Sequence, residues 1–348
     1  MHSLTHIKRP LVFLHNARCG GNKLNVIFMN QYQRKDWFKL GQNADGTISS
    51  NYEQLITDVK IEHRPLYIGH IVYGLHQYFT HPIQYISNVR EPIARTLSLY
   101  TRWITQENAG TTLPNFLNQS FEADNGMVKR FAGIGEFNGQ PFDFINNQPL
   151  SSVTVNDAIY TRAQQHVDEF IDDIIVLERL NATSILLEQK YALTPLFALT
   201  YNHMNQTGLN QKLSIESVPE QWHEWIVSHN SYDLKLYDYI KRYTDKRIHN
   251  LDAETKNSIR IRTLLTEGLT HSNEPYMTIG GFFNQLSLVL GKLKGFGLLD
   301  DLFEVCKLVI QHPELIIEHR QAFLQQIKAE LTVEQSNQLT ACLAAVDA

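Results

Sequence analysis

The stretch that most constrains the fold runs from residue 11 to residue 28. The four apolar residues Leu11–Leu14 follow a proline and predict a short buried strand. The pair Gly20-Gly21 can adopt the backbone angles of a sharp turn, and the apolar residues that follow fall on one face of a helix. A strand, a glycine turn and a helix start make an anion site, because unpaired backbone N–H groups and the positive end of the helix dipole point at the same place.

Two cations flank this turn. Arg18 and Lys23 can each donate to a phosphate oxygen, although an ordinary strand-to-helix connection with solvated charges has the same pattern. The spacing is not that of a Walker A loop, because Leu24 and Asn25 stand where that loop needs a hydroxyl for magnesium. The stretch therefore argues against an ATP-hydrolysing motor or a conventional kinase.

A second strand-to-helix junction lies between residues 84 and 100. Tyr85–Val89 has strand character, and Pro92 suits the first turn of a helix. Arg90 then stands at the strand end and Ser98 on the helix behind it, so that both side chains converge on one phosphate. The alternative is that Arg90 pairs with the adjacent Glu91 and that the serine is passive.

Both junctions resemble motifs of one enzyme family, the carbohydrate sulfotransferases that use 3′-phosphoadenosine-5′-phosphosulfate (PAPS). The segment from Phe13 to Leu24 resembles their 5′-phosphosulfate loop, F-L-H-I-P-K-T-G-G-T-S/T-L. The segment from Arg90 to Tyr100 matches their 3′-phosphate motif, R-[DE]-P-[IV]-x-R-x-x-S-x-Y. The motifs occur in the family's order, and the resemblance extends over residues 10 to 248.

Strand patterns alternate with longer helical patterns, which predicts an α/β fold with a mostly parallel sheet. The resemblance implies a P-loop nucleotide-kinase-like three-layer domain in residues 1–250. An all-helical C-terminal module is expected in residues 251–348. We further expect loops over Gln31–Glu53, a turn-rich interruption over Gly133–Gln148 and a strand over Ile174–Glu178. The helical patterns of the module are Ser258–Leu269, Gly281–Leu293, Leu298–Gln311, Pro313–Leu331 and Thr332–Val346.

The resemblance implies transfer of a sulfuryl group from PAPS to a hydroxyl of an acceptor by in-line displacement. The acceptor expected by analogy is a saccharide or a glycolipid headgroup, and the nucleotide product is 3′-phosphoadenosine 5′-phosphate (PAP). No metal is required. The residues implied in cofactor binding are Arg18, Cys19, Gly20, Gly21, Asn22, Lys23, Arg90 and Ser98. Arg18 is also implied in catalysis, because it would hold the charge that develops on the leaving phosphate.

A general base is needed to take the proton of the acceptor hydroxyl. His70 follows the apolar strand 66–69, and parallel sheets place function at the carboxyl ends of their strands. A Gly-His at this point is also common in the family, so His70 is the first candidate, although a lone histidine beside a strand is more often structural. The further candidates are His76 and Glu62.

The loop departs from the family pattern. Arg18 replaces the usual lysine, and Cys19, Asn22 and Lys23 stand among the positions of the usual hydroxyl residues. Cys19 is either a thiol of lowered pKa, sensitive to oxidation, or a buried inert one. If these changes abolish transfer, the chain is a PAP-binding relative without catalysis that acts through its helical module. An ATP-dependent phosphotransferase is a third and less favoured reading.

Four further positions carry weaker signals. Lys129 and Arg130 either face the acceptor or cofactor or are solvated helix charges. Asn205 and Thr207 fall where the family has a loop that closes over the nucleotide, although the arginine expected there is missing.

Composition limits the partners. The net charge is −5 and no basic run is long enough for a nucleic-acid arm, so nucleic acid is not expected as the main partner. The 3 cysteines are widely spaced and odd in number, which favours neither a disulfide framework nor a zinc cluster.

We expect no membrane span and a cytoplasmic location, as in a bacterial relative or a form without the anchor of animal Golgi enzymes. The C-terminal helices are suited to core packing or to homo-oligomerisation.

Overall fold

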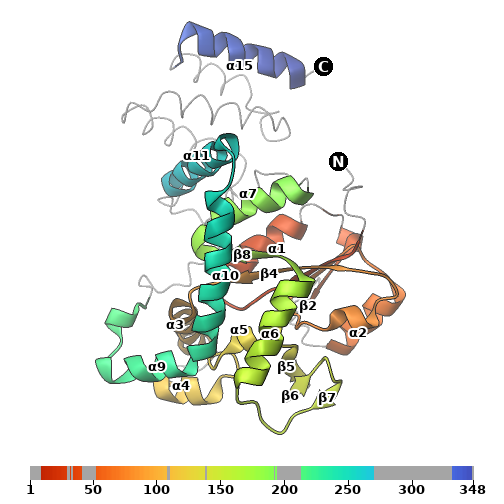
Figure 1. The fold of residues 1–348 in the computed structure, drawn as a ribbon, viewed down its shortest axis with the longest axis vertical. Coiled ribbons are helices and arrows are strands. Elements are labelled where there is room, and N and C mark those ends of the chain that lie inside the picture. Colours follow the sequence, from red (N-terminus) through yellow and green to blue (C-terminus); the bar gives the residue numbers. More distant parts are fainter. Residues whose placement is uncertain are drawn as a thin grey trace. The chain divides into compact units, whose positions relative to one another are not determined.

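The computed structural model describes residues 9–29, 32, 34–40, 52–107, 110–137, 139–191, 193, 213–269 and 331–346. The chain divides into two compact units. The first contains residues 1–193 and 207–250, and the second contains residues 194–206 and 251–348. Figure 1 shows the elements of both units.

A five-stranded sheet forms the centre of the first unit. Its order is β2-β3-β1-β4-β8, and each neighbouring pair is parallel. The strands are β1 (Leu11–Leu14), β2 (Trp37–Leu40), β3 (Leu66–Gly69), β4 (Gln84–Val89) and β8 (Ile171–Val176). β1 and β3 are buried along their whole length, as expected for strands covered on both faces. The expected α/β fold with a mostly parallel sheet is therefore confirmed.

The order of the strands places a switch point at β1. The chain passes from β1 to β2 and β3 on one side of it, and then to β4 and β8 on the other. Leu14 at the end of β1 lies in register with Gly69 of β3 and Ser87 of β4. Ligands of open α/β sheets bind in the crevice outside the carboxyl ends of the strands at such a point. The segments that follow β1, β3 and β4 meet there.

Helices connect the strands and pack against the sheet, as in a three-layer α/β arrangement (Figure 1). They are α1 (Gly21–Met29), α2 (Tyr52–Ile61), α3 (Pro92–Arg102), α4 (Leu113–Gln119), α5 (Gly126–Phe131), α6 (Asp157–Phe170), α7 (Leu180–Tyr191), α9 (His223–His229) and α10 (Ser231–His249). Shorter 3₁₀ turns lie at Arg34–Asp36, Leu75–Tyr78, Leu177–Arg179, Ile215–Ser217 and Glu220–Trp222, and a π turn lies at Trp103–Glu107. Pro92 opens α3, and the Glu91 carboxylate caps it by accepting from the N–H groups of Ile93 and Ala94.

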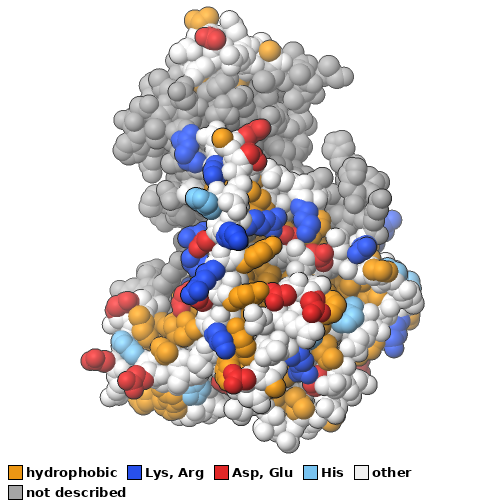
Figure 2. Space-filling model, viewed as in Figure 1, with side chains coloured by type: hydrophobic (Ala, Val, Ile, Leu, Met, Phe, Trp, Pro, Cys, Tyr) orange, Lys and Arg blue, Asp and Glu red, His pale blue; other side chains and the backbone are white. Residues whose placement is uncertain are grey.

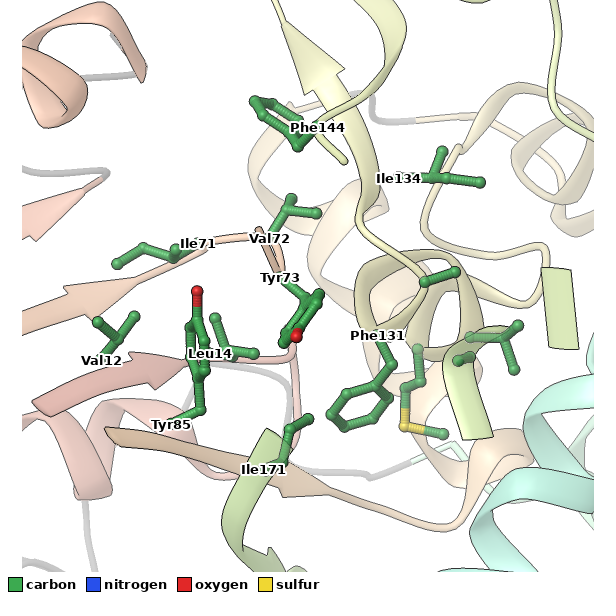
Figure 3. Packing of buried hydrophobic residues seen from close by; sticks show 14 of the residues in the cluster. Val12, Leu14, Ile71, Val72, Tyr73, Tyr85, Phe131, Ile134, Phe144 and Ile171 are labelled. Atoms are coloured by element: carbon green, nitrogen blue, oxygen red, sulfur yellow. The ribbon is translucent and has the colours of Figure 1, made fainter. Parts of the chain in front are cut away.

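The hydrophobic core fills the space between the sheet and the helices α5 and α6 (Figure 3). Phe131 from α5 is fully buried there, beside Tyr73 and Tyr85. Ile171 at the start of β8 closes the same cluster. The core therefore joins β4 and β8 to the segment after β3, which fixes the positions of the strand ends.

A small antiparallel sheet extends the unit beyond α5. It consists of β5 (Ile134–Phe137), β6 (Gln140–Asp143) and β7 (Gln148–Pro149), in that order. This region is the turn-rich interruption expected over Gly133–Gln148. The turns are present, but they connect strands that pair with one another. These strands were not predicted, because segments of two to four residues are too short to show an alternation of apolar and polar residues.

Two expectations from the sequence are wrong in detail. Residues Gln31–Glu53 were expected to be loops, but β2 lies within them and pairs with β3. β2 is a four-residue edge strand whose first three residues are only half-buried, so it has no continuous apolar run. The strand expected over Ile174–Glu178 begins earlier, at Ile171, and ends at Val176, where a 3₁₀ turn follows.

The second unit contains the described helices α11 (Ala253–Leu269) and α15 (Val333–Val346). They match the first and last helical patterns expected in the C-terminal module. The three patterns between them, over residues 281–293, 298–311 and 313–331, lie mostly or wholly outside the described residues.

None of the described helices combines the length and the apolar composition that a membrane crossing requires.

Replacement of Phe131 tests the packing of the hydrophobic core. We expect Phe131→Ala to lower the free energy of unfolding by about 3 to 5 kcal/mol, because the ring is fully buried and its removal leaves a cavity. Urea denaturation followed by circular dichroism measures the change. The matched control is Phe170→Ala, since that ring is 48% exposed; an equal loss in both variants would contradict the packing shown in Figure 3.

Candidate functional site

Two buried asparagines hold the loop that follows β1. The backbone N–H of Asn16 donates to Oδ1 of Asn88 at 2.8 Å, and its Nδ2 donates to the Asn88 carbonyl at 2.7 Å. Asn88 in turn donates from Nδ2 to the carbonyl of Cys19 at 2.7 Å. Both asparagines are fully buried, so these hydrogen bonds are made away from water and fix the loop firmly to the end of β4.

The two glycines of the loop are required by close packing. Gly20 has a φ of +79°, and a Cβ there would lie 2.7 Å from Cδ1 of Leu177. A Cβ on Gly21 would overlap the imidazole ring of His15. Larger residues at either position would therefore displace the loop from the strand ends.

Helix α1 begins at Gly21, and the N–H of Leu24 donates to the carbonyl of Gly20. The N–H groups of the first turn of a helix have no partner within that helix. In α1 they are therefore hydrogen-bond donors at the positive end of the helix dipole. The side chains of Asn22 and Lys23 lie outside the described structure. Only the backbone of these two predicted site residues is placed at the loop.

Three of the predicted cofactor-binding side chains are brought together beside this turn. Nε of Arg18 donates to Oγ of Ser98 at 2.9 Å, and Nη1 of Arg90 donates to the carbonyl of Arg18 at 3.1 Å. Arg18 has a φ of +62°, a left-handed conformation that non-glycine residues seldom adopt and that clusters at functional sites. The side chain that contacts Ser98 is that of Arg18, whereas Arg90, the arginine expected to converge with the serine, contacts the backbone of Arg18.

This corner of the molecule carries uncompensated positive charge. Within the described residues, Arg18 and Arg90 have no carboxylate at ion-pair distance. Burial lowers the pKa of Arg18, and repulsion from Arg102 and Arg90 lowers it further. Cations that repel one another around a row of N–H donors favour an anionic ligand.

A second layer of charges lies beneath the first and is fully paired. Arg95 is 0% exposed; its Nε donates to the Ala17 carbonyl at 3.1 Å, and its Nη groups bond the backbone and the carboxylate of Glu122. Glu122 also pairs with Arg130. Burial alone would raise the pKa of Glu122, but Arg130 and Arg95 hold it at about 2.

Sequence reasoning gave no role to Arg95 within its motif and did not find Glu122. Arg95 carries a motif signal, since it stands three residues before the serine. Glu122 has no such signal, because its contacts with α3 and α5 arise only when the chain folds.

His70 stands at the end of β3, beside the loop, as predicted. Its Nδ1 lies 3.2 Å from the carbonyl oxygen of His15, and the two rings stack at 4.5 Å. Since a carbonyl only accepts, Nδ1 carries the proton and Nε2 keeps a free lone pair. Surrounding protein and the charge of Arg130 lower the pKa of His70 to about 4, although the residue is exposed to solvent. The imidazole is therefore neutral at pH 7.

The other two candidate bases lie elsewhere. Nδ1 of His76 is 3.1 Å from the hydroxyl of Tyr85, which is near the first residue of β4. Glu62 precedes β3 and lies 4.0 Å from Arg64. Neither residue has a hydrogen bond or ion pair with the β1 loop, Arg90 or Ser98 among the contacts of the described residues.

Cys19 is the buried, inert alternative of the two that the sequence left open. Its side chain is 0% exposed, and burial raises its pKa to about 12. A thiol of this kind is not a reactive thiolate at neutral pH. Cys19 contributes its backbone to the loop rather than its sulfur.

The weaker candidates have structural partners. Lys129 is buried and bonds Asp124 at 3.0 Å, and Arg130 is held by Glu122, so neither is a solvated helix charge. Asn205 and Thr207 lie outside the described residues. Asn25, where a Walker loop has its hydroxyl region, is buried with Nδ2 3.4 Å from the His15 ring.

No protein-family model matches this chain, and no curated protein matches it. Within the residues that the structure describes, there is no cluster of three His, Cys, Asp or Glu side chains positioned to hold a metal ion.

The ion pairs of Glu122 with Arg95 and Arg130 should make the stability of the protein depend on pH. The folded pKa of Glu122 lies below its ordinary value of 4.5, so its contribution to the free energy of unfolding is fully present above about pH 4.5 and is lost as the pH falls toward 2. We expect Glu122→Gln to destabilise the protein at pH 6 and to differ progressively less from wild type as the pH is lowered. Urea denaturation at several pH values tests this.

The control for this series is Glu62→Gln, at an exposed carboxylate on the opposite edge of the sheet. A stability difference for Glu122→Gln that stays constant down to pH 3 would show that Glu122 is not held ionised by the two arginines.

Proposed function

We propose that this chain is a sulfotransferase that moves a sulfuryl group from PAPS to a hydroxyl of an acceptor, with a saccharide or glycolipid as the expected acceptor. The observation that supports this most is the meeting of Arg18, Arg90 and Ser98 beside the first turn of α1. These residues come from both motifs that resemble the family, and the parallel sheet places them at one switch point.

The donor set fits a nucleotide with two separate phosphate groups. The N–H groups of the first turn of α1 and the Arg18 guanidinium would hold the 5′-phosphate, whereas Arg90 and Ser98 would hold the 3′-phosphate. The unpaired charge of Arg18 and Arg90 is the structural reason for this fit. When bound, PAPS would supply an activated sulfuryl group. The proposal that the domain is P-loop nucleotide-kinase-like rests on the same fit between these residues and two phosphate groups.

The chain's own residues would then supply positioning and charge stabilisation. Arg18 and the loop N–H groups stabilise negative charge on the phosphate oxygen, which is the main contribution expected in transfer of this kind. Nε2 of His70 accepts the proton of the acceptor hydroxyl, since its Nδ1 is turned to the His15 carbonyl. An anionic ligand bound close to His70 would favour the charged imidazolium and so raise the pKa of His70.

The nucleotide assignment is tested by calorimetric titration with PAP, run beside ATP with magnesium. We expect PAP to bind and ATP with magnesium to bind far more weakly. Arg90→Ala should weaken PAP binding at least tenfold, because it removes a charge-assisted hydrogen bond. The matched control is Arg242→Ala, whose side chain is 80% exposed on α10. A folded protein that fails to bind PAP would contradict the proposal.

The role of His70 is tested by turnover. With PAPS and a panel of neutral saccharide acceptors, His70→Ala should lower the rate of PAP formation by about 10² to 10⁴ while leaving PAP affinity almost unchanged. His76→Ala is the control, because that histidine bonds the hydroxyl of Tyr85 and not the loop. If the wild-type protein binds PAP but shows no turnover, the chain is a non-catalytic relative; equal rates for both variants would remove His70 as the base.

A further inference from the structure

A cavity lies in the first unit and is not lined by any residue of the β1 loop. Its volume is 420 Å³, and it is formed by the end of α6, the first half of β8, α7 and the second half of α10. Because it opens at the amino end of β8, it is at the opposite edge of the sheet from Arg90 and the β1 loop. Its volume is within the range of about 300 to 1,000 Å³ that is typical of small-molecule sites.

Three exposed aromatic side chains surround this cavity. Phe170 is 48% exposed, Tyr239 is 36% exposed and Tyr243 is 69% exposed, and all three line the cavity. They come from α6 and α10, and Tyr239 and Tyr243 are one helical turn apart on the same face of α10. Figure 2 shows hydrophobic side chains beside basic ones on the face that α10 crosses. Exposed aromatic residues that gather at one cavity, rather than singly, indicate a binding surface.

The charges around the cavity are of both signs and largely satisfied. Asp173 is buried and accepts hydrogen bonds from Lys190 at 2.6 Å, Tyr191 at 2.9 Å and Arg247 at 3.0 Å. This network fixes Arg247 at the cavity wall. Four carboxylates and one guanidinium line the cavity, those of Asp168, Glu169, Asp172, Asp173 and Arg247, so the wall disfavours an anion. Each carboxylate accepts a hydrogen bond from a neighbouring protein group and can accept another from a ligand hydroxyl.

Contacts with neighbouring residues also hold two of the three aromatic side chains, Tyr239 and Phe170, in place. The hydroxyl of Tyr239 donates to Oδ1 of Asp168 at 2.7 Å, which orients its ring. Phe170 contacts Tyr73 and His166 with ring centroids 6.0 and 6.1 Å apart. Tyr243 makes no ring contact or hydrogen bond with another described residue, so its face and hydroxyl are available to a ligand.

The geometry points to a binding site for a neutral saccharide in this cavity, separate from the nucleotide site. A sugar ring has an apolar C–H face that packs against aromatic rings, and hydroxyl groups that bond a guanidinium and tyrosine hydroxyls. Phe170, Tyr239 and Tyr243 supply the rings, and Arg247 supplies fixed donors. The inference does not depend on the proposed function, because no residue of the nucleotide site takes part.

Saturation-transfer difference NMR on the full chain tests this site. The probes are neutral oligosaccharides of glucose, galactose, mannose and N-acetylglucosamine, with tetramethylammonium as the probe for a cation site. We expect transfer to at least one oligosaccharide and at least a fivefold loss of that signal in Tyr243→Ala. Tyr243→Phe should retain most of it, because the aromatic face remains. The matched control is Val227→Ala, an exposed apolar residue on α9 that does not line the cavity.

Tyr243 is 69% exposed, so its replacement is not expected to unfold the protein. The proposal is overturned if no oligosaccharide shows transfer, if Tyr243→Ala leaves the transfer unchanged, or if only tetramethylammonium binds at Tyr243. PAP binding by the same samples reports on the nucleotide site, and failure of either test leaves the other standing.

Discussion

One buried guanidinium, that of Arg95, connects the parts of the first unit that make up the candidate site. It bonds the carbonyl of Ala17 in the loop and the carboxylate of Glu122, and it lies 3.8 Å from Asp233. Asp233 itself accepts hydrogen bonds from the first turn of α5. A fully buried cation is costly unless it is paired. The loop, α3, α5 and α10 are therefore held in one arrangement, because each supplies a partner to this network.

The network divides the positive charges of the site into two layers. The inner charges, on Arg95 and Arg130, are paired with the carboxylates of Glu122 and Asp233 and are committed to structure. The outer charges, on Arg18 and Arg90, have no carboxylate partner in the described part of the chain and lie at the loop that leads into α1. An anionic ligand is what completes such an arrangement. A phosphate-bearing donor therefore fits this edge of the sheet better than a neutral one.

Sequence reasoning identified what short-range patterns encode. The strand Leu11–Leu14 was readable because a strand buried on both faces is a continuous apolar run, whereas Trp37–Leu40 was missed because an edge strand is half-exposed. Two strand-to-helix junctions in one parallel sheet indicated that Arg18, Arg90 and Ser98 lie at the same sheet edge, but the hydrogen bond from Arg18 to Ser98 was not predicted. The role of Glu122 could not be predicted, because its partners Arg95 and Arg130 lie on other elements and no sequence periodicity indicates such contacts.

The claim that the site is a nucleotide site is tested most directly by a crystal structure determined with PAP bound. We predict that Arg90 and Ser98 contact the 3′-phosphate, and that Arg18 and the N–H groups of the first turn of α1 contact the 5′-phosphate. A nucleotide bound at another place on the molecule, or a site that stays empty in crystals grown with saturating PAP, would contradict the claim.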